Sequence, residues 1–440
     1  MPDSTQAPAL SAQLLAAAQA VSAVLSGQSL SEALEHAPSS LRPGAQALSF
    51  HAMRHLGLAR AAAAVLIPRQ PAEPLVRALI LLGLCLLDAS LQHAQAEPLA
   101  HGTPVYPSHT LVHQLVEAAH AHRRSRSAKG LINAVLRRYG REYATLRPRL
   151  VEQPEARWNH PTWWIATLQR AWPDDWMRIL QAAQQPPPMM LRVNTRALTR
   201  EDLAQRLQLA GISCHAVGDD GLRLDSPQPV RTIPGYEQGW WSVQDASAQC
   251  AAPLLPLADG QRVLDACAAP GGKTAHLLER HSLYLTALDS DTSRLARVYD
   301  TLQRLGLQSP DVTLKCADAA DVPAWWDGQP YDAILADVPC TASGIVRRHP
   351  DIRWLRRPDD LSRTAALQTR IIDALWPTLI PGGHLLYATC SIFPQEGEDQ
   401  ARAFLERHPD ARHLSAPGHI LPGNPSDGDG FFYALFAKTS

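Results

Sequence analysis

The chain has 440 residues, of which 45% are hydrophobic and 19% are charged, and its formal net charge at pH 7 is −1. This length exceeds one core of ordinary size, so we expect two or three domains, and the apolar content excludes a disordered protein. The seven cysteines form no CxxC pair and no Cys/His pair at zinc spacing. Their number and spacing argue against a disulfide framework and a structural metal, and favour a reducing, cytoplasmic setting.

The first 142 residues are rich in Ala and Leu at helical spacing, which predicts an all-helical domain. Their longest apolar run, ALILLGLCLLD from Ala78, is about half of the roughly 20 residues that a membrane span requires, so it predicts a buried helix. The N-terminal MPDSTQAPAL lacks the basic segment and apolar core of an export signal. We therefore expect no membrane partner.

Positive charge is concentrated in residues 101–150, where nine Lys and Arg stand against two Glu, an excess of seven. The basic residues are Arg123, Arg124, Arg126, Lys129, Arg137, Arg138, Arg141, Arg147 and Arg149. Such a run is either a solvated helical face or a surface for a polyanion.

The texture of the sequence changes twice more. Residues 143–238 combine a Trp-rich piece, the break QQPPPMM and the strand candidates MLRVNT and GLRLD, which together predict a small α/β connector domain. From residue 239 to 440, apolar strands alternate with helical stretches; the strands are in QRVLDACAAP, SLYLTALDSD, DVTLKCADA, YDAILADVPC and GGHLLYATC. This alternation predicts a parallel sheet with helices on both faces.

In such a sheet, ligands bind outside the carboxyl ends of the strands. The segment VLDACAAPGGKT indicates a strand, a turn of small residues and the start of a helix, where the backbone can approach a ligand closely. Its GKT ending resembles a Walker A loop. However, Cys267 stands where the first glycine of that loop belongs, and Pro270 where an amide should face phosphate. A nucleotide hydrolase is therefore an alternative, but a disfavoured one.

Three successive strands finish in an acid, at Asp289, Asp318 and Asp337. Asp289 lies eighteen residues beyond Gly271, an offset that suits the two hydroxyls of a ribose. Three carboxylates around one Gly-rich turn predict a ligand with ribose hydroxyls, an adenine amine and a cationic amino group. S-adenosylmethionine has all three, whereas the carboxylates would repel a nucleoside triphosphate unless a metal intervened.

Two cysteines, Cys340 and Cys390, follow strand ends on this ligand side. The thiolate is the reactive form, so either could be a nucleophile. A methyl donor beside a thiolate fits methylation of a pyrimidine, because addition of sulfur to carbon 6 makes carbon 5 enamine-like. A second cysteine could assist the later release. The remaining cysteines that we expect as small buried residues are Cys85, Cys214, Cys250 and Cys316.

The segment VRRHPDIRWLRR, directly after Cys340, is basic and contains Trp354. Its arginines are Arg347, Arg348, Arg353, Arg356 and Arg357. Guanidinium groups contact phosphates, and an aromatic ring can stack an unstacked base, so we favour RNA contact over a loop with Trp354 in a core. A pyrimidine target must leave its stack, which costs least in a single strand or loop.

The motifs CAAPGGKT, DVPCTASGIVRRHPDIRWLRR, YATCS and GDGFFYA resemble those of the RNA 5-methylcytosine methyltransferases, in the branch that acts on bacterial small-subunit ribosomal RNA. KGLINAVLRRYG is similar to the end of that branch's helical NusB-like RNA-binding domain, and PMMLRVNT to its strand ahead of the catalytic domain. The resemblance implies a Rossmann-like class I methyltransferase domain (239–440) after an all-α NusB-like domain (1–142) and a small α/β, RRM-like connector (143–238). The implied reaction is methyl transfer from S-adenosylmethionine to carbon 5 of a cytosine in 16S ribosomal RNA, through a covalent cysteine–cytosine intermediate.

Residue by residue, the resemblance implies that Asp289 binds the ribose of the donor, Asp318 lies at the adenine, and Asp337 lies near the methionine and the cytosine N3. The residues implied to line the donor are Cys267, Ala268, Ala269, Pro270, Gly271, Gly272 and Lys273, with Arg294 as a further contact.

In this family the nucleophile is the TC cysteine, which implies Cys390, and the PC cysteine, Cys340, releases the product; DNA cytosine methyltransferases use the PC cysteine instead. The chain departs from the family in DVPC for DAPC and in PQEGEDQ for PEEN. We expect a monomer without a metal, with small-subunit ribosomal RNA as its partner. A non-catalytic RNA-binding factor is the remaining alternative, and the intact donor segment with both cysteines argues against it.

Overall fold

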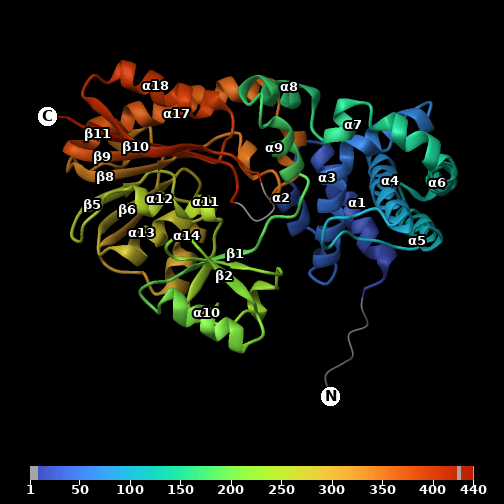
Figure 1. Ribbon diagram of the computed structural model, residues 1–440, viewed down its shortest axis with the longest axis horizontal. Coiled ribbons are helices and arrows are strands. Elements are labelled where there is room, and N and C mark those ends of the chain that lie inside the picture. Colours follow the sequence, from blue (N-terminus) through green and yellow to red (C-terminus); the bar gives the residue numbers. More distant parts are fainter. Residues whose placement is uncertain (1–7, 424–427, 440) are drawn as a thin grey trace. The chain divides into compact units, whose positions relative to one another are not determined.

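The computed structural model describes residues 8–423 and 428–439; residues 1–7, where most of the segment expected to lack an export signal falls, lie outside this part. The chain divides into two units. The first comprises the residues up to Pro186 together with Val346–Arg357, and the second comprises Pro187–Ile345 with the residues from Pro358 onward. Figure 1 colours both along the sequence, and each unit is described by itself below.

The first unit is helical, as predicted. Its helices are α1 (Leu10–Leu25), α2 (Leu30–Glu35), α3 (Arg42–Leu66), α4 (Pro74–Ala94), α5 (Ser108–Ala121), α6 (Lys129–Leu150), α7 (Pro154–Trp158), α8 (Thr162–Ala171), α9 (Trp176–Ala182) and α16 (Ile352–Leu355), with the short 3-10 helix η1 (Arg126–Ala128). By length and composition alone α4 could cross a membrane, but 83% of its most apolar window is buried in the unit. The predicted buried helix is therefore confirmed, and α1, α3, α5 and α6 cover it.

A buried acid in α4 ties this core to α6. The hydroxyl of Tyr139 donates to Asp88 Oδ1 at 2.6 Å, and Arg147 Nε donates to the same oxygen at 3.1 Å. Burial raises the pKa of Asp88, against the opposing charge of Arg147 and these hydrogen bonds. Arg147 therefore stabilises the core through its ion pair with Asp88, whereas the other basic residues of 101–150 do not contact this acid.

The segment Val346–Arg357 belongs to the helical unit, although the flanking chain belongs to the other. Trp354 is part of the helical core and is 7% exposed, and its indole Nε1 donates to the carbonyl of Met53 at 2.8 Å. Asp351 Oδ2 accepts the backbone N–H of Leu30 at 2.9 Å, at the first residue of α2. A carboxylate satisfies one of the unpaired amides that every helix start carries.

Arg353 is fully buried in the same unit and donates to the carbonyl of Ala183 at 2.7 Å and of Asn159 at 3.3 Å. Arg347 is also buried, at 1% exposure. The expectation that Arg347, Arg353 and Trp354 contact RNA is therefore wrong. Trp354 packs in the helical core and Arg353 donates to backbone carbonyls of the same unit, so neither side chain is available to RNA.

The second unit begins with a four-stranded antiparallel sheet in the order β2-β3-β1-β4. Its strands are β1 (Met190–Val193), β2 (Cys214–Val217), β3 (Gly221–Leu224) and β4 (Trp241–Val243), accompanied by α10 (Arg200–Leu209) and η2 (Val230–Thr232). Thr199 and Asp202 form a capping box at the start of α10. The predicted α/β connector is present, with MLRVNT and GLRLD as two of its strands.

The larger sheet has seven strands in the order β10-β11-β9-β8-β5-β6-β7. They are β5 (Arg262–Asp265), β6 (Tyr284–Asp289), β7 (Val312–Cys316), β8 (Tyr331–Asp337), β9 (Leu379–Thr389), β10 (Ala411–Ile420) and β11 (Phe431–Lys438). The five strands from β5 to β9 pair in parallel, as predicted, whereas β10 and β11 form an antiparallel edge.

Helices cover both faces of this sheet, with α17 and α18 on one face and α12, α13 and α14 on the other (Figure 1). The helices of this part are α11 (Ala246–Gln249), α12 (Ala251–Leu254), α13 (Gly272–Arg280), α14 (Thr292–Leu305), α15 (Val322–Trp325), α17 (Pro358–Leu375) and α18 (Glu398–Arg407), with η3 (Ser343–Ile345), η4 (Trp376–Thr378) and η5 (Pro394–Glu396). This arrangement is the predicted Rossmann-like domain.

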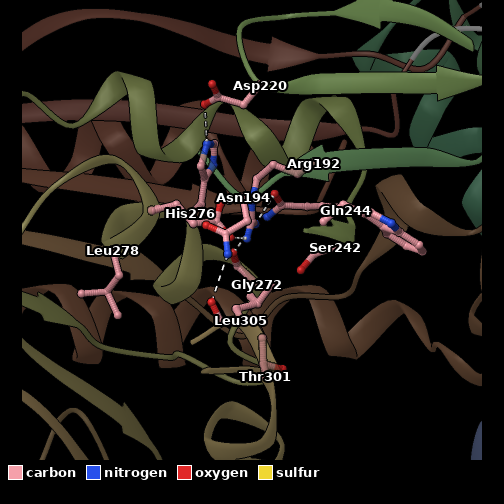
Figure 2. Close-up of polar contacts among 12 residues, drawn as sticks. Arg192, Asn194, Asp220, Ser242, Gln244, Gly272, His276, Leu278, Thr301 and Leu305 are labelled. Carbon is pink, nitrogen blue, oxygen red and sulfur yellow. Dashed lines mark hydrogen bonds and ion pairs between the residues drawn. The ribbon is translucent and has the colours of Figure 1, made fainter. Parts of the chain in front are cut away.

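A buried arginine links the four-stranded sheet to helix α13, one of the helices that cover the larger sheet (Figure 2). Arg192, in β1, forms a bidentate ion pair with Glu279 of α13 at 2.6 and 2.7 Å, and both side chains are at most 1% exposed. Its NH1 group donates to the carbonyl of Gly272, the first residue of α13, at 2.5 Å and to Gln244 Oε1 at 2.7 Å. The start of α13 is thereby fixed on the four-stranded sheet.

Removing the buried tryptophan tests the structural role of Val346–Arg357. We expect Trp354→Ala to lower the free energy of unfolding by about 3–5 kcal/mol, because it leaves a cavity in the helical core. Urea-induced unfolding measures this change. Met177→Ala, at a residue 48% exposed on α9, is the matched control and should change stability by less than about 0.5 kcal/mol. A fully stable Trp354→Ala protein with weakened RNA binding would restore the RNA interpretation.

Candidate active site

A cavity of about 560 Å³ lies at the carboxyl ends of β5 to β9, entirely within the second unit. Its walls are Ala266, Cys267, Ala269, Pro270, Asp289, Ser290, Arg294, Ala317, Asp318, Ala319, Asp337, Val338, Pro339, Cys340, Ala342, Ile345, Leu367, Arg370, Ile371 and Cys390. The three predicted carboxylates and both predicted cysteines therefore face one space. Of the predicted donor residues, Ala268, Gly271, Gly272 and Lys273 are not among the lining residues.

The two cysteines meet because β8 and β9 are parallel neighbours. Asp337, the last residue of β8, pairs with Ala388, and the next loops carry Cys340 and Cys390. Their sulfur atoms are 3.4 Å apart, which is hydrogen-bonding distance for thiols. The backbone N–H of Gly344 donates to the carbonyl of Cys390 at 2.9 Å and so joins the two loops directly.

The turn between β5 and α13 forms the floor of the cavity. Its Ala269–Pro270 peptide bond is cis, and Gly271 has φ of +96°. A Cβ atom on Gly271 would lie 3.0 Å from Cα of Val298 in α14. Glycine is required there both by the left-handed backbone and by the close approach of α14.

Lys273, behind this turn, pairs with Asp337 at 2.5 Å. Burial lowers the pKa of its ammonium, but the charges of Asp337 and Cys390 and the hydrogen bond to Asp337 outweigh burial and raise the pKa. Lys273 therefore stays cationic beside both groups. The lysine that resembles a Walker A residue is thus engaged by a carboxylate.

Arginines pair with the other two strand-end acids, whereas Asp337 pairs with a lysine. Asp289 accepts the backbone N–H of Ala269 at 3.2 Å, and Arg294 approaches the same Oδ2 atom at 3.3 Å. Asp318 is paired with Arg370 of α17 at 2.9 Å. The sequence analysis missed Arg370, since it lies on a helix about fifty residues further along the chain, and only its basic charge on an amphipathic helix could have suggested it.

Three cysteines line the cavity, and their surroundings differ. Burial raises the pKa of the Cys267 thiol well above its ordinary value. The pKa of Cys340 is also raised, first by its hydrogen bond with Cys390, then by burial and by the negative charges of Cys390 and Glu396. Cys390 instead interacts electrostatically with the Lys273 ammonium. The Cys340 thiol is therefore held neutral, whereas the sulfur of Cys390 interacts with a cation.

Of the four cysteines expected as buried small residues, only Cys85 is buried. Cys214 and Cys250 are half-buried, and Cys316 is exposed, so the expectation is wrong for Cys316. Cys316 ends β7, where the sheet edge is open, and its sulfur lies 3.2 Å from the hydroxyl of Thr292. All seven cysteines are free thiols.

Comparison with known proteins adds independent information. Residues 252–437 match the family described as 16S rRNA methyltransferase RsmB/F, and residues 160–231 match the ferredoxin-like domain of RsmF/B-like methyltransferases. The chain is 43% identical over 426 residues to Ribosomal RNA small subunit methyltransferase B of Vibrio vulnificus (strain YJ016), covering 94% of this chain and 96% of the relative. The protein of the same name from Vibrio cholerae is 46% identical over 340 residues, covering 76% and 77%.

Solved structures agree in fold. The crystal structure of PH0851 superimposes with a TM-score of 0.78 at 23% identity, over 98% of this chain and 99% of that one. A methyltransferase homolog protein from Pyrococcus horikoshii has a TM-score of 0.57 at 27% identity, over 64% of this chain and 97% of that one.

The sheet order, the cavity at its carboxyl edge and these likenesses define the class: a Rossmann-like methyltransferase with a ferredoxin-like connector and a helical N-terminal region. The coverage of the curated relatives narrows it further. The chain belongs to the RsmB/F family of 16S rRNA methyltransferases.

Asp265, at the end of β5, is a fully buried acid that does not line the cavity. It accepts a hydrogen bond from the hydroxyl of Thr274 at 2.6 Å. Burial raises its pKa to about 7; the Asp337 charge adds to this, and the Thr274 bond and Lys273 oppose it. Because the folded protein holds this proton more tightly than the unfolded chain, Asp265 contributes stability at low pH that is lost as the pH rises through about 7.

Replacing Asp265 with its neutral isostere tests this linkage. We expect Asp265→Asn to gain stability relative to the wild type as the pH rises from about 5 to about 8. Urea-induced unfolding over this range measures the difference between the two proteins. Asp300→Asn, at an exposed position on α14, should show a difference that does not change with pH. A constant difference for Asp265→Asn would mean that Asp265 is ionised throughout.

Proposed function

We propose that this protein transfers a methyl group from S-adenosylmethionine to carbon 5 of a cytosine in 16S ribosomal RNA, through a covalent bond between Cys390 and the base. The observation that carries the proposal is the pair of cysteine sulfurs 3.4 Å apart in a cavity that three strand-end carboxylates share. Membership of the RsmB/F family supports the RNA substrate.

The cavity suits the methyl donor in size and in charge. Its volume of about 560 Å³ lies in the range of small-molecule sites. In this proposal Asp289 accepts hydrogen bonds from ribose hydroxyls, Asp318 accepts one from an adenine amine and Asp337 faces a cationic methionine end. The lining residues Leu367 and Ile371 add apolar walls. The bound donor supplies an electrophilic methyl group. These carboxylates would repel a triphosphate, and Lys273 is already paired, so ATP hydrolysis is disfavoured.

The first chemical step is addition of the Cys390 thiolate to carbon 6. This bond pushes electrons toward N3 and carbon 5 of the ring. The Lys273–Asp337 pair lies beside Cys390 and provides a proton for N3, which stabilises the negative charge that develops there. Carbon 5 then has enamine character and takes the methyl group.

Release reverses the addition. The proton on carbon 5 leaves to solvent, the carbon 6–sulfur bond breaks with its electrons returning to Cys390, and N3 gives its proton back to the Lys273–Asp337 pair. The Cys340 thiol, held neutral by its raised pKa, donates a hydrogen bond to the departing sulfur across the 3.4 Å gap. The two cysteines thus have different tasks because one is suited to carry charge and the other is suited to stay protonated.

The helical unit offers a surface for RNA. The exposed basic residues of the turn between α5 and η1, of η1 and of α6 are Arg123, Arg124, Arg126, Lys129, Arg137, Arg141 and Arg149. Lys129, Arg137 and Arg141 recur at multiples of four residues, which places them along one side of α6. Cations in such a row track a phosphate backbone.

Substituting each cysteine tests the mechanism. We expect Cys390→Ala to lose methyl transfer and to form no adduct, whereas Cys340→Ala should accumulate a denaturation-resistant protein–RNA adduct, because release fails after addition. The measurement uses labelled S-adenosylmethionine and protein-free 16S ribosomal RNA, with nucleoside digestion and denaturing electrophoresis.

The Cys316→Ala protein, altered at an exposed cysteine outside the cavity, is the control and should transfer methyl groups like the wild type. Adducts in Cys390→Ala but not in Cys340→Ala would reverse the two roles. Label in a nucleoside other than 5-methylcytidine would contradict the proposed reaction.

Charge reversal on α6 tests the RNA surface. We expect Arg137→Glu with Arg141→Glu to weaken 16S ribosomal RNA binding and to reduce the slope of log affinity against log salt by about 2, or about 1 for each lost phosphate contact. Filter binding at several salt concentrations measures both. Arg402→Glu with Arg412→Glu, at exposed positions on α18 and β10, changes the net charge by the same amount and is the control. Equal effects in the two proteins would place the RNA elsewhere.

A further inference from the structure

Glu396 is a fully buried carboxylate next to the two catalytic loops. It is the last residue of η5, in the segment PQEGEDQ where the sequence departs from the family pattern. Neither its charge nor its burial is needed by the donor cavity, because Glu396 is not one of the lining residues. A buried charge is costly unless hydrogen bonds compensate it, so its contacts indicate its role.

The carboxylate of Glu396 bridges the residues that directly follow each cysteine. Thr341, after Cys340, donates its backbone N–H to Oε1 at 2.8 Å and its hydroxyl to Oε2. Ser391, after Cys390, donates its hydroxyl to Oε2 at 2.6 Å. One side chain therefore joins the loop after β8 that carries Cys340 (the PC loop) and the loop after β9 that carries Cys390 (the TC loop).

Two residues of α17 complete the set. Thr364 donates to Oε1 at 2.6 Å, and Gln368 donates to Oε1 at 3.3 Å and to the carbonyl of Pro339, just before Cys340, at 2.9 Å. The backbone carbonyl of Glu396 also accepts the hydroxyl of Tyr387, in β9, at 2.8 Å. These donors are neutral, so the carboxylate is solvated by hydrogen bonds but is not neutralised by them.

The loop that Glu396 holds is strained. Ala342, the second residue after Cys340, has φ of +58°, a left-handed conformation that is unfavourable for residues with a Cβ atom. Such a conformation persists only where the surroundings fix it. The two hydrogen bonds from Thr341 to Glu396 provide that restraint at the adjacent residue.

We propose that Glu396 is a positioning residue for the methyl-transfer reaction: it holds the loops of Cys340 and Cys390 in register, and its negative charge, whose hydrogen-bond donors are all neutral, keeps Cys340 as the neutral thiol of the pair. The groups that act electrostatically on Cys340 are Cys390 and Glu396. The charges of Cys340 and Glu396 in turn act on Tyr387. The cation of the site, Lys273, acts on Cys390 instead. The inference deepens the proposed function, on which its catalytic part rests.

The charge effect can be measured without RNA. In the Cys390→Ala protein, the rate of Cys340 alkylation by iodoacetamide at pH 8.5, followed by mass spectrometry, reports the thiolate fraction of Cys340. We expect Glu396→Gln to raise this rate about tenfold, because loss of a nearby negative charge makes the thiolate about one pH unit easier to form. Glu398→Gln, at an exposed acid two residues away, should leave the rate unchanged. An unchanged rate in folded Glu396→Gln would overturn the charge role, whether or not the protein methylates RNA.

The positioning effect is measured in the transfer assay with both cysteines present. We expect Glu396→Gln to lower kcat by about 10²-fold, as misplaced reacting groups do, while KM for the RNA stays within about twofold. The covalent adduct should accumulate as in Cys340→Ala. Normal kcat would overturn the positioning role.

Glu396→Asp keeps the proposal testable if Glu396→Gln does not fold. It retains the charge but shortens the reach to Thr341 and Ser391. We expect kcat to fall about tenfold or more, by the same loss of positioning, while the Cys340 alkylation rate in the Cys390→Ala background stays within about twofold of its value with Glu396. A raised alkylation rate or an unchanged kcat in Glu396→Asp would contradict the proposal.

Discussion

The parallel register of β8 against β9 pairs Asp337 with Ala388, so that both strands deliver their last residues to one edge of the sheet. This register is the reason that two cysteines separated by 50 positions in the chain lie with their sulfurs 3.4 Å apart. A slip of one residue in either strand would turn its side chains to the opposite face and separate the pair. The donor cavity, the paired lysine and the loop contacts are arranged around this edge.

Local electrostatics then gives different chemistry to identical side chains. Cys267, Cys340 and Cys390 all line one cavity, yet their surroundings differ. Burial raises the pKa of Cys267, and a neighbouring sulfur, burial and a carboxylate raise the pKa of Cys340. Cys390 interacts with an ammonium group. The catalytic unit keeps such charges in place by pairing them within its core, as the Arg192–Glu279 contact does at the start of α13. A preorganised field of this kind costs no reorganisation at the moment of reaction.

Much of the fold and part of the site could be predicted from the sequence, because both follow from periodicity. The alternation of strands and helices predicted the sheet. The acids and cysteines at strand ends predicted one shared edge, and the residues that meet there are Asp289, Asp337, Cys340 and Cys390. Partners contributed by distant helices could not be predicted: the pairing of Asp318 with Arg370 depends on how α17 packs. Trp354 was misjudged, since a basic run with one aromatic residue has the same composition whether it binds RNA or fills a core. The proposed domain boundaries and residue roles remain predictions.

The segment Val346–Arg357 has a consequence for how such proteins can be assembled and inherited. It begins one residue after η3, within the PC loop region, yet Trp354 and Arg353 are part of the helical core. A gene that encoded only the helical residues before Pro187 would produce a core without Trp354 and an α2 whose Leu30 amide lacks its carboxylate partner. A gene that encoded only the later residues would expose an apolar indole. The two units therefore cannot be exchanged by joining separate gene segments end to end, because the helical unit takes residues from both sides of the second unit's first stretch.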